Sequence, residues 1–238
     1  MTVISEDMKP ETWSLVDSGA CDYDFNMAMD ESLLALAAET TRPVLRFYGW
    51  TQAAASFGYF QRIAEVEQFT PLRPLVRRPT GGGIVPHDAD WTYSVAVPVT
   101  NRWYGLKAIE SYRRVHEWVQ AALAQLGIQT ALAPCCLKTG PGRCFLGYEQ
   151  FDLLWNGRKI AGAAQRRTRD GLLIQGSLQL PPVANFPSRQ QWQEAMAACG
   201  AEAHEIAWSS LNPSAEFLDR ARELARTKYS QDAYNRRR

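Results

Sequence analysis

A chain of 238 residues, 46% of them hydrophobic, is long enough to bury a substantial core and fits one large domain or two small ones. Its formal net charge of +1 gives no general electrostatic reason to expect nucleic acid or a membrane as a partner. The five cysteines form an odd set without a Cys-x-x-Cys pair, which argues against a disulfide framework and a zinc ribbon. We therefore expect mostly free thiols and no metal site.

The start of the chain and its hydropathy favour a cytoplasmic protein. Residues 1–7 have neither a basic start nor an apolar run, and no apolar stretch approaches the ~20 residues that cross a bilayer. The sequence contains no repeat, no low-complexity segment and no Gly/Ser linker. We therefore predict one domain over residues 1–238.

The first hundred residues predict one helix followed by short strands. Residues 24–38 begin with capping residues and continue with helix formers whose apolar members follow a helical spacing. Residues 44–50 and 54–59 are short and aromatic with glycines at their ends, which favours two adjacent strands. Residues 91–97 alternate between large apolar and smaller side chains, the period-2 pattern of a half-buried strand.

A second helix is predicted from residue 108 to residue 126, where the apolar residues follow the 3.6-residue period. His116 lies within it, with no second potential ligand at helical spacing. We interpret His116 as a surface or packing residue rather than a metal ligand.

Beyond this helix the sequence predicts a hairpin and one more strand. Asn156-Gly157 is the commonest type I′ turn pair, and it places Lys159 on the second strand of the hairpin. Residues 172–180 predict the further strand, and the chain from Arg189 onward has a helical pattern.

Residues 77–88, Arg-Arg-Pro-Thr-Gly-Gly-Gly-Ile-Val-Pro-His-Asp, join a pair of cations to a bare stretch of backbone. Adjacent glycines cost folding free energy, so a globular protein keeps them where side chains would obstruct something. Their N–H groups can cradle an anion, and the two arginines add planar, permanently charged donors. The alternative is a wide glycine hairpin on an exposed rim. We favour a site for a phosphate or an activated carboxylate, in a loop that links residues 75–78 to the strand of residues 91–97.

Three segments occur in an order that resembles the lipoate-protein ligase and octanoyltransferase family, within the larger group that includes biotin-protein ligases. They are the glycine loop of residues 77–88, the Gly-Arg-Lys-Ile-Ala-Gly-Ala-Ala-Gln-Arg-Arg segment of residues 157–167, and the Gly176-Ser177 pair. Residues 26–30 and 45–50 also look like this family, so the resemblance covers roughly residues 12 to 185. It implies an α+β fold with a mixed, largely antiparallel sheet flanked by helices, of the class II synthetase type.

The resemblance implies attachment of an octanoyl or lipoyl group to one lysine of a lipoyl carrier domain. Lys159 matches the family's lysine beside the reacting carbonyl, and His87 with Asp88 would brace the end of the glycine loop. The positions that match the acyl and activated-carboxyl pocket are Arg78, Thr80, Gly81, Gly82, Gly83, Ile84, Val85, His87, Asp152, Gly162 and Ala164. Two positions depart from the family pattern: Gln175 stands where a histidine is frequent, and Ala163 where serine is commoner.

Cys144 indicates how the acyl group would be activated. Amide formation needs either an acyl-adenylate or a thioester, and thioester transfer profits from a cysteine nucleophile. Cys144 begins a Cys-Phe pair fifteen residues before Lys159, and such a pair carries the nucleophile in the single-domain octanoyltransferases that this chain resembles. An adjacent ammonium such as that of Lys159 would favour the reactive thiolate. Without the motif, an isolated cysteine is more often a small apolar filler.

We therefore favour an octanoyltransferase that forms a thioester on Cys144 and uses no cofactor. Large ligases of the family have a C-terminal accessory domain that supports adenylation, and we expect none here. The main alternative is a lipoate-protein ligase that uses ATP and Mg²⁺ in the same pocket, and a less favoured one is a non-catalytic acyl- or carrier-binding protein. The implied partners are acyl carrier protein as donor and, as acceptors, the glycine-cleavage H protein and the E2 subunits of 2-oxoacid dehydrogenases.

Overall fold

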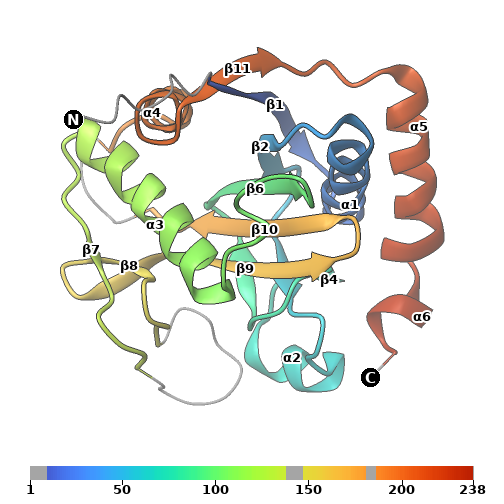
Figure 1. The fold of residues 1–238 in the computed structure, drawn as a ribbon. Helices are drawn as coiled ribbons and strands as arrows, with labels where there is room; N and C mark the ends of the chain where they lie inside the picture. Colours follow the sequence, from blue (N-terminus) through green and yellow to red (C-terminus); the bar gives the residue numbers. More distant parts are fainter. Residues whose placement is uncertain (1–9, 138–146, 181–185, 238) are drawn as a thin grey trace, which may run out of the picture.

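One large mixed sheet organises the computed structural model, which describes residues 10–137, 147–180 and 186–237 (Figure 1). Its strands lie in the order β11-β1-β2-β6-β10-β9-β8-β7. The pairs β11–β1 and β1–β2 are parallel, and the other neighbours are antiparallel. The strands are β1 (Glu11–Cys21), β2 (Val44–Trp50), β6 (Trp91–Pro98), β7 (Ala131–Leu132), β8 (Leu153–Trp155), β9 (Arg158–Thr168), β10 (Gly171–Leu178) and β11 (Ile206–Ser210). The prediction of an α+β fold with a mixed, largely antiparallel sheet is confirmed.

A second, three-stranded sheet has the order β4-β3-β5. Its strands are β3 (Ala54–Phe57), β4 (Leu75–Arg77) and β5 (Val85–His87). The prediction that residues 44–50 and 54–59 form adjacent strands is wrong, because β2 and β3 belong to different sheets. The glycine loop follows β4 as predicted, but it leads into β5 and not directly into the strand of residues 91–97. Strands β4 and β5 each have only three residues and therefore show no clear period in the sequence.

Helices cover both faces of the large sheet (Figure 1). They are α1 (Tyr23–Thr40), α2 (Ile63–Phe69), α3 (Ala108–Gln125), α4 (Arg189–His204), α5 (Ala215–Leu224), the π-helical turn η1 (Ala225–Tyr229) and α6 (Asp232–Asn235). The predictions for α1 and α3 are confirmed. The helical prediction from Arg189 onward is right for α4 and α5 and misses β11, which pairs with β1. Among the described helices, none combines the length and the apolar character needed to cross a bilayer.

Strand β6 lies in the middle of the large sheet, and every one of its residues is buried. Trp91, Tyr93, Val95 and Val97 pack into the main hydrophobic cluster, together with residues of α3 and α4. On the other face, the Ser94 hydroxyl donates to Asp30 of α1. The prediction of a half-buried strand is therefore wrong, because a helix layer covers the face that carries the smaller side chains.

The Asn-Gly hairpin forms as predicted and brings β8 and β9 together. Asn156 and Gly157 both have positive φ, at 48° and 75°, as a type I′ turn requires. Lys159 accordingly lies near the start of β9.

A buried ion pair joins α1 to the large sheet. Arg46 of β2 donates from Nη1 to Oδ1 of Asp30 over 2.7 Å, and both side chains are fully buried. The same guanidinium donates to the backbone carbonyl and the side-chain oxygen of Asn26. Asp30 accepts further hydrogen bonds from Tyr48, Ser94 and Gln175. These contacts fix the position of α1 over the strands that line the cavity described below.

We expect Asp30→Ala to lower the free energy of unfolding by about 3–5 kcal/mol, because it leaves the Arg46 guanidinium buried without its carboxylate. Urea unfolding followed by circular dichroism measures this. Asp219→Ala is the matched control: it removes the pair with Arg222, in which both side chains are more than half exposed, and should change stability little. An Asp30→Ala protein as stable as the control would contradict the importance given to the buried pair.

Candidate active site

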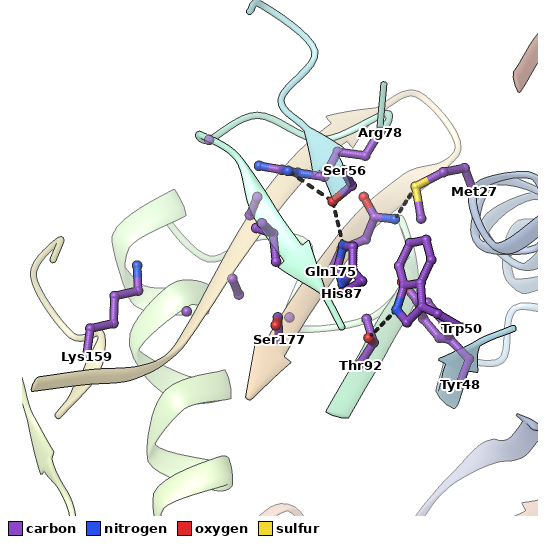
Figure 2. Close-up of a pocket in the computed structure, with 16 residues that line it drawn as sticks. Met27, Tyr48, Trp50, Ser56, Arg78, His87, Thr92, Lys159, Gln175 and Ser177 are labelled. Carbon is purple, nitrogen blue, oxygen red and sulfur yellow. Dashed lines mark hydrogen bonds between the residues drawn. The ribbon is translucent and has the colours of Figure 1, made fainter. Parts of the chain in front are cut away.

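A cavity lies among residues of both sheets and α1 (Figure 2). The residues that line it are Met27, Tyr48, Trp50, Ser56, Arg78, Gly82, Val85, His87, Thr92, Lys159, Gly162, Ala163, Ala164, Gln175, Gly176 and Ser177. Seven of the positions proposed from the sequence are among them: Arg78, Gly82, Val85, His87, Lys159, Gly162 and Ala164. The glycine loop and β9, far apart in the chain, therefore meet at one cavity.

The other proposed positions among the described residues are not part of the cavity lining. The Thr80 hydroxyl donates to the Gln175 amide oxygen, and Ile84 packs in a hydrophobic cluster with Ala55 and Phe57 of β3. The carbonyls of Gly81 and Gly83 accept hydrogen bonds from Arg78. These residues shape the wall, and the fifth, Asp152, binds Lys159.

The two arginines of the glycine loop have separate surroundings, so the prediction that both would offer donors to an anion is wrong for Arg77. Its side chain is fully buried, and it donates to backbone carbonyls, including those of Tyr234 and Asn235 in α6. Arg78 does line the cavity, and its guanidinium donates to the Gly81 and Gly83 carbonyls and to Ser56 Oγ. Alternate residues of an extended segment point to opposite sides, which separates the pair.

The glycine loop packs closely against the segment that follows β3. A Cβ atom at Gly58 would lie 1.9 Å from the carbonyl oxygen of Gly82, so position 58 accommodates no side chain. Gly82 itself has a φ of 84°, which other residue types rarely adopt. In the sequence Gly58 marks only the end of a predicted strand, and no local pattern signals this contact.

Lys159 projects toward the cavity from β9, and a buried carboxylate holds its ammonium group. Nζ lies 2.7 Å from Oδ2 of Asp152, whose side chain is fully buried, and the lysine side chain is 7% exposed. Asp152 also accepts a hydrogen bond from the Tyr112 hydroxyl and one from the Glu149 backbone N–H. Burial, and then the charge of Asp152, raise the pKa of Tyr112 well above its usual value, so the phenol stays protonated. The arrangement holds the Lys159 ammonium in a fixed position at the cavity wall, which also carries the guanidinium of Arg78.

Asp90 braces His87, whereas Asp88, which was expected to brace the end of the glycine loop together with His87, is exposed to solvent. Nδ1 of His87 lies 2.8 Å from Oδ2 of Asp90, and Nε2 lies 2.8 Å from Oγ of Ser56. The imidazole stacks on the indole of Trp50 at a centroid distance of 3.8 Å and an angle of 16°. Because the chain turns after β5, the carboxylate of Asp90 comes back to the His87 imidazole, while the neighbouring Asp88 is exposed to solvent.

Gln175, one of the departures from the family pattern, connects the glycine loop to the buried ion pair. Its Oε1 accepts from Thr80 over 2.7 Å, and its Nε2 donates to Asp30 over 2.7 Å. The amide has both an acceptor and a donor group, so one side chain can satisfy two different neighbours. Gln175 therefore couples the position of the loop to that of α1.

Cys144, the proposed nucleophile, lies outside the described residues. Within residues 10–137, 147–180 and 186–237, no three His, Cys, Asp or Glu side chains gather as a metal site would require.

His116 is fully buried on α3, which makes it a packing residue rather than a surface one. Its Nδ1–H donates to the carbonyl of Tyr112 over 2.8 Å, and the two rings lie 4.3 Å apart. Burial lowers the pKa of His116 from 6.5 to about 4, because the apolar surroundings disfavour the charged imidazolium. His116 thus packs behind Tyr112 as a neutral ring.

The comparison with known families and sequences finds relatives for most of this chain. Residues 22–185 match the family model described as the lipoyl protein ligase A/B catalytic domain. The protein named octanoyltransferase LipM from Bacillus subtilis (strain 168) is 38% identical over 186 residues, which cover 73% of this chain and 67% of that protein. The protein of the same name from Staphylococcus aureus is 37% identical over 183 residues, which cover 71% and 66%. The match thus spans about two thirds of these relatives' length.

Solved structures with the same fold share less sequence. The crystal structure of a lipoate-protein ligase A bound with ATP has a TM-score of 0.73 and 22% identity, over 96% of this chain and 99% of that one. A bipartite lipoate protein ligase from Thermoplasma acidophilum has a TM-score of 0.70 and 21% identity, over 96% and 97%. At such identities the likeness establishes the fold.

We expect the protein to lose stability as the pH falls from about 6.5 to about 4, because unfolded His116 takes up a proton that the folded ring does not. The unfolded state binds more protons in this window, so acid favours it, by on the order of 3 kcal/mol for His116. His204, whose pKa is also lowered to about 4 by burial, adds in the same direction.

Urea unfolding of the wild type and of His116→Gln across this pH range measures the effect. The variant should show a shallower dependence of unfolding free energy on pH. Equal slopes in the two proteins would contradict a neutral, buried His116.

Proposed function

Because the chain belongs to the lipoyl protein ligase A/B catalytic-domain family, we propose that it is an octanoyltransferase, which passes an octanoyl group from a thioester to a lysine of a lipoyl carrier domain. Relatives at 35–38% identity that carry the name octanoyltransferase LipM support this reading. The structural observation that carries the proposal is the fixed ammonium of Lys159 in a cavity walled largely by apolar and small side chains.

The cavity suits a thioester of a medium-chain acid. Met27, Val85, Ala163 and Ala164 offer apolar contact to an alkyl chain, while Lys159 offers one positive charge. A tetrahedral intermediate at an acyl carbon carries a developing oxyanion, and a pre-positioned cation lowers its energy most when water is excluded. Asp152 keeps the ammonium in place, so it need not reorganise when the oxyanion forms.

The transfer proceeds through Cys144. Its thiolate attacks the donor's thioester carbon and releases the donor thiol, which leaves an octanoyl thioester on Cys144. The neutral amine of the acceptor lysine then attacks that thioester, the C–S bond breaks, and the amine proton passes to the departing thiolate. A thioester already carries its activation, so this route uses neither ATP nor Mg²⁺. Acyl carrier protein is the proposed donor, and the glycine-cleavage H protein and dehydrogenase E2 subunits are the proposed acceptors.

Gly162→Ala should reduce the transfer rate about 10²-fold without unfolding the protein. The new Cβ would lie 2.7 Å from both Cε and Nζ of Lys159, so the flexible end of the lysine must move while the backbone stays. Gly105→Ala is the control, because its nearest neighbour is a carbonyl oxygen 3.8 Å away. If the two variants have the same midpoint of thermal unfolding and the same transfer rate, the Lys159 ammonium does not have a catalytic position.

Intact-protein mass spectrometry of an apo lipoyl domain distinguishes the transferase from the ligase. We expect an octanoyl mass increase with octanoyl-acyl carrier protein and no ATP, and none with free octanoate, ATP and Mg²⁺. In Cys144→Ala the increase should disappear. Modification in the ATP mixture alone would establish a ligase in which Cys144 is a bystander, and modification in neither mixture would overturn the proposal of an enzyme.

A further inference from the structure

We infer that Ser56, His87 and Asp90 form a second reactive centre in the cavity, a serine nucleophile that accepts an acyl group from a thioester or ester and passes it to water. The chain would then also act as a thioesterase. The choice of a medium-chain acyl group as substrate rests on the proposed function, whereas the reactivity of the serine rests on the geometry alone.

The three side chains form a continuous hydrogen-bonded chain. Ser56 Oγ lies 2.8 Å from His87 Nε2, and His87 Nδ1 lies 2.8 Å from Asp90 Oδ2. All three residues are at least nine-tenths buried. This arrangement activates serine on many unrelated folds: the histidine takes the proton of the serine hydroxyl, and the carboxylate orients the imidazole ring.

The surroundings of Asp90 determine which ring nitrogen holds the proton. Oδ2 of Asp90 accepts hydrogen bonds from the hydroxyls of Thr92, at 3.0 Å, and Ser177, at 2.6 Å, in addition to His87. A carboxylate oxygen can only accept, so the ring proton of a neutral His87 lies on Nδ1, toward Asp90. Nε2 of His87 is then the acceptor for the Ser56 hydroxyl, which is the tautomer that a general base needs.

Stacking on the ring face, in addition to the hydrogen bonds of its two nitrogens, holds the His87 imidazole in this orientation. Trp50 stacks on it at 3.8 Å, and the Trp50 indole N–H donates to Thr92, which itself donates to Asp90. The ring therefore has little freedom to rotate away from Ser56. Fixed orientation of the base is what distinguishes an activated serine from an ordinary buried one.

Ser56 and His87 face the same cavity as Lys159, as Figure 2 shows. Nη1 of Arg78 donates to Ser56 Oγ over 3.3 Å, so a guanidinium lies beside the oxygen that would become nucleophilic. A nearby positive charge favours developing negative charge on that oxygen and on the adjoining acyl oxygen. Ser56 belongs to the wall of the cavity, so it would lie beside an acyl group bound there.

The reaction balances with water as the co-reactant. Ser56 Oγ attacks the thioester carbon, His87 Nε2 takes the hydroxyl proton, and the C–S bond breaks with that proton passing to the departing thiolate. An acyl ester on Ser56 remains. Water, deprotonated by His87, then attacks the ester, the C–O bond breaks, and Ser56 recovers its proton as the free acid leaves.

Labelling of the native full-length protein with a fluorophosphonate, which phosphonylates activated serines, tests this inference. We expect one adduct per chain, mapped by tandem mass spectrometry to Ser56 and absent after heat denaturation. The Ser56→Ala variant should lose the label. The Ser111→Ala variant should keep it, because Ser111 is a buried serine on α3 outside the cavity lining. The mapping uses wild-type protein, so it stands even if the Ser56 variant does not fold.

Hydrolysis of p-nitrophenyl octanoate, measured in a Cys144→Ala background to exclude the proposed thiol, gives the rate. His87→Asn should slow this hydrolysis by roughly 10²-fold or more, the usual contribution of a general base. No adduct on Ser56, or an adduct on another residue, would overturn the inference. Octanoyl transfer to a lipoyl domain, assayed on the same wild-type preparation, separates the two hypotheses: transfer without a Ser56 adduct defeats only the serine centre, and an adduct without transfer defeats only the proposed octanoyltransferase.

Discussion

A guanidinium in the middle of a protein needs an anion beside it, and the pair Arg46–Asp30 meets that constraint at the centre of this fold. Removing two charges from water is costly, so the partners must meet at close range with their remaining hydrogen-bonding groups satisfied. Asn26, Tyr48 and Ser94 supply most of those contacts. The pair therefore determines how α1 lies on the sheet.

The same network reaches the cavity through one side chain. Gln175 joins Asp30 to Thr80, and Thr80 precedes the three glycines. A loop without side chains has little of its own to hold its shape, so it depends on such external contacts and on the Arg78 guanidinium that donates to its carbonyls. The conformation of the glycine loop is thus a property of the whole site.

Each buried cation at the cavity is compensated in a different way. Asp152 neutralises Lys159, while Arg78 donates to backbone carbonyls and to a hydroxyl. Ionic pairing fixes the position of Lys159, whereas Arg78 braces the loop through its carbonyl contacts and also lies against Ser56. The chemistry proposed for the cavity therefore relies on Lys159 and on the Ser56–His87–Asp90 chain, and Arg77, although conspicuous in the sequence, does not line the cavity.

Features that depend on near neighbours in the chain could be predicted from the sequence alone. The 3.6-residue period defined α1 and α3, and Asn156-Gly157 defined the hairpin that places Lys159. The ordered motifs indicated the family and most of one cavity wall. The packing of distant segments sets which polar groups meet: Arg77 anchors α6, Asp90 holds His87, and Ser56 lies against a ring 31 residues away. Such pairings, like the division of β2 and β3 between two sheets, depend on where distant segments cross, and no local period or turn signal carries that information.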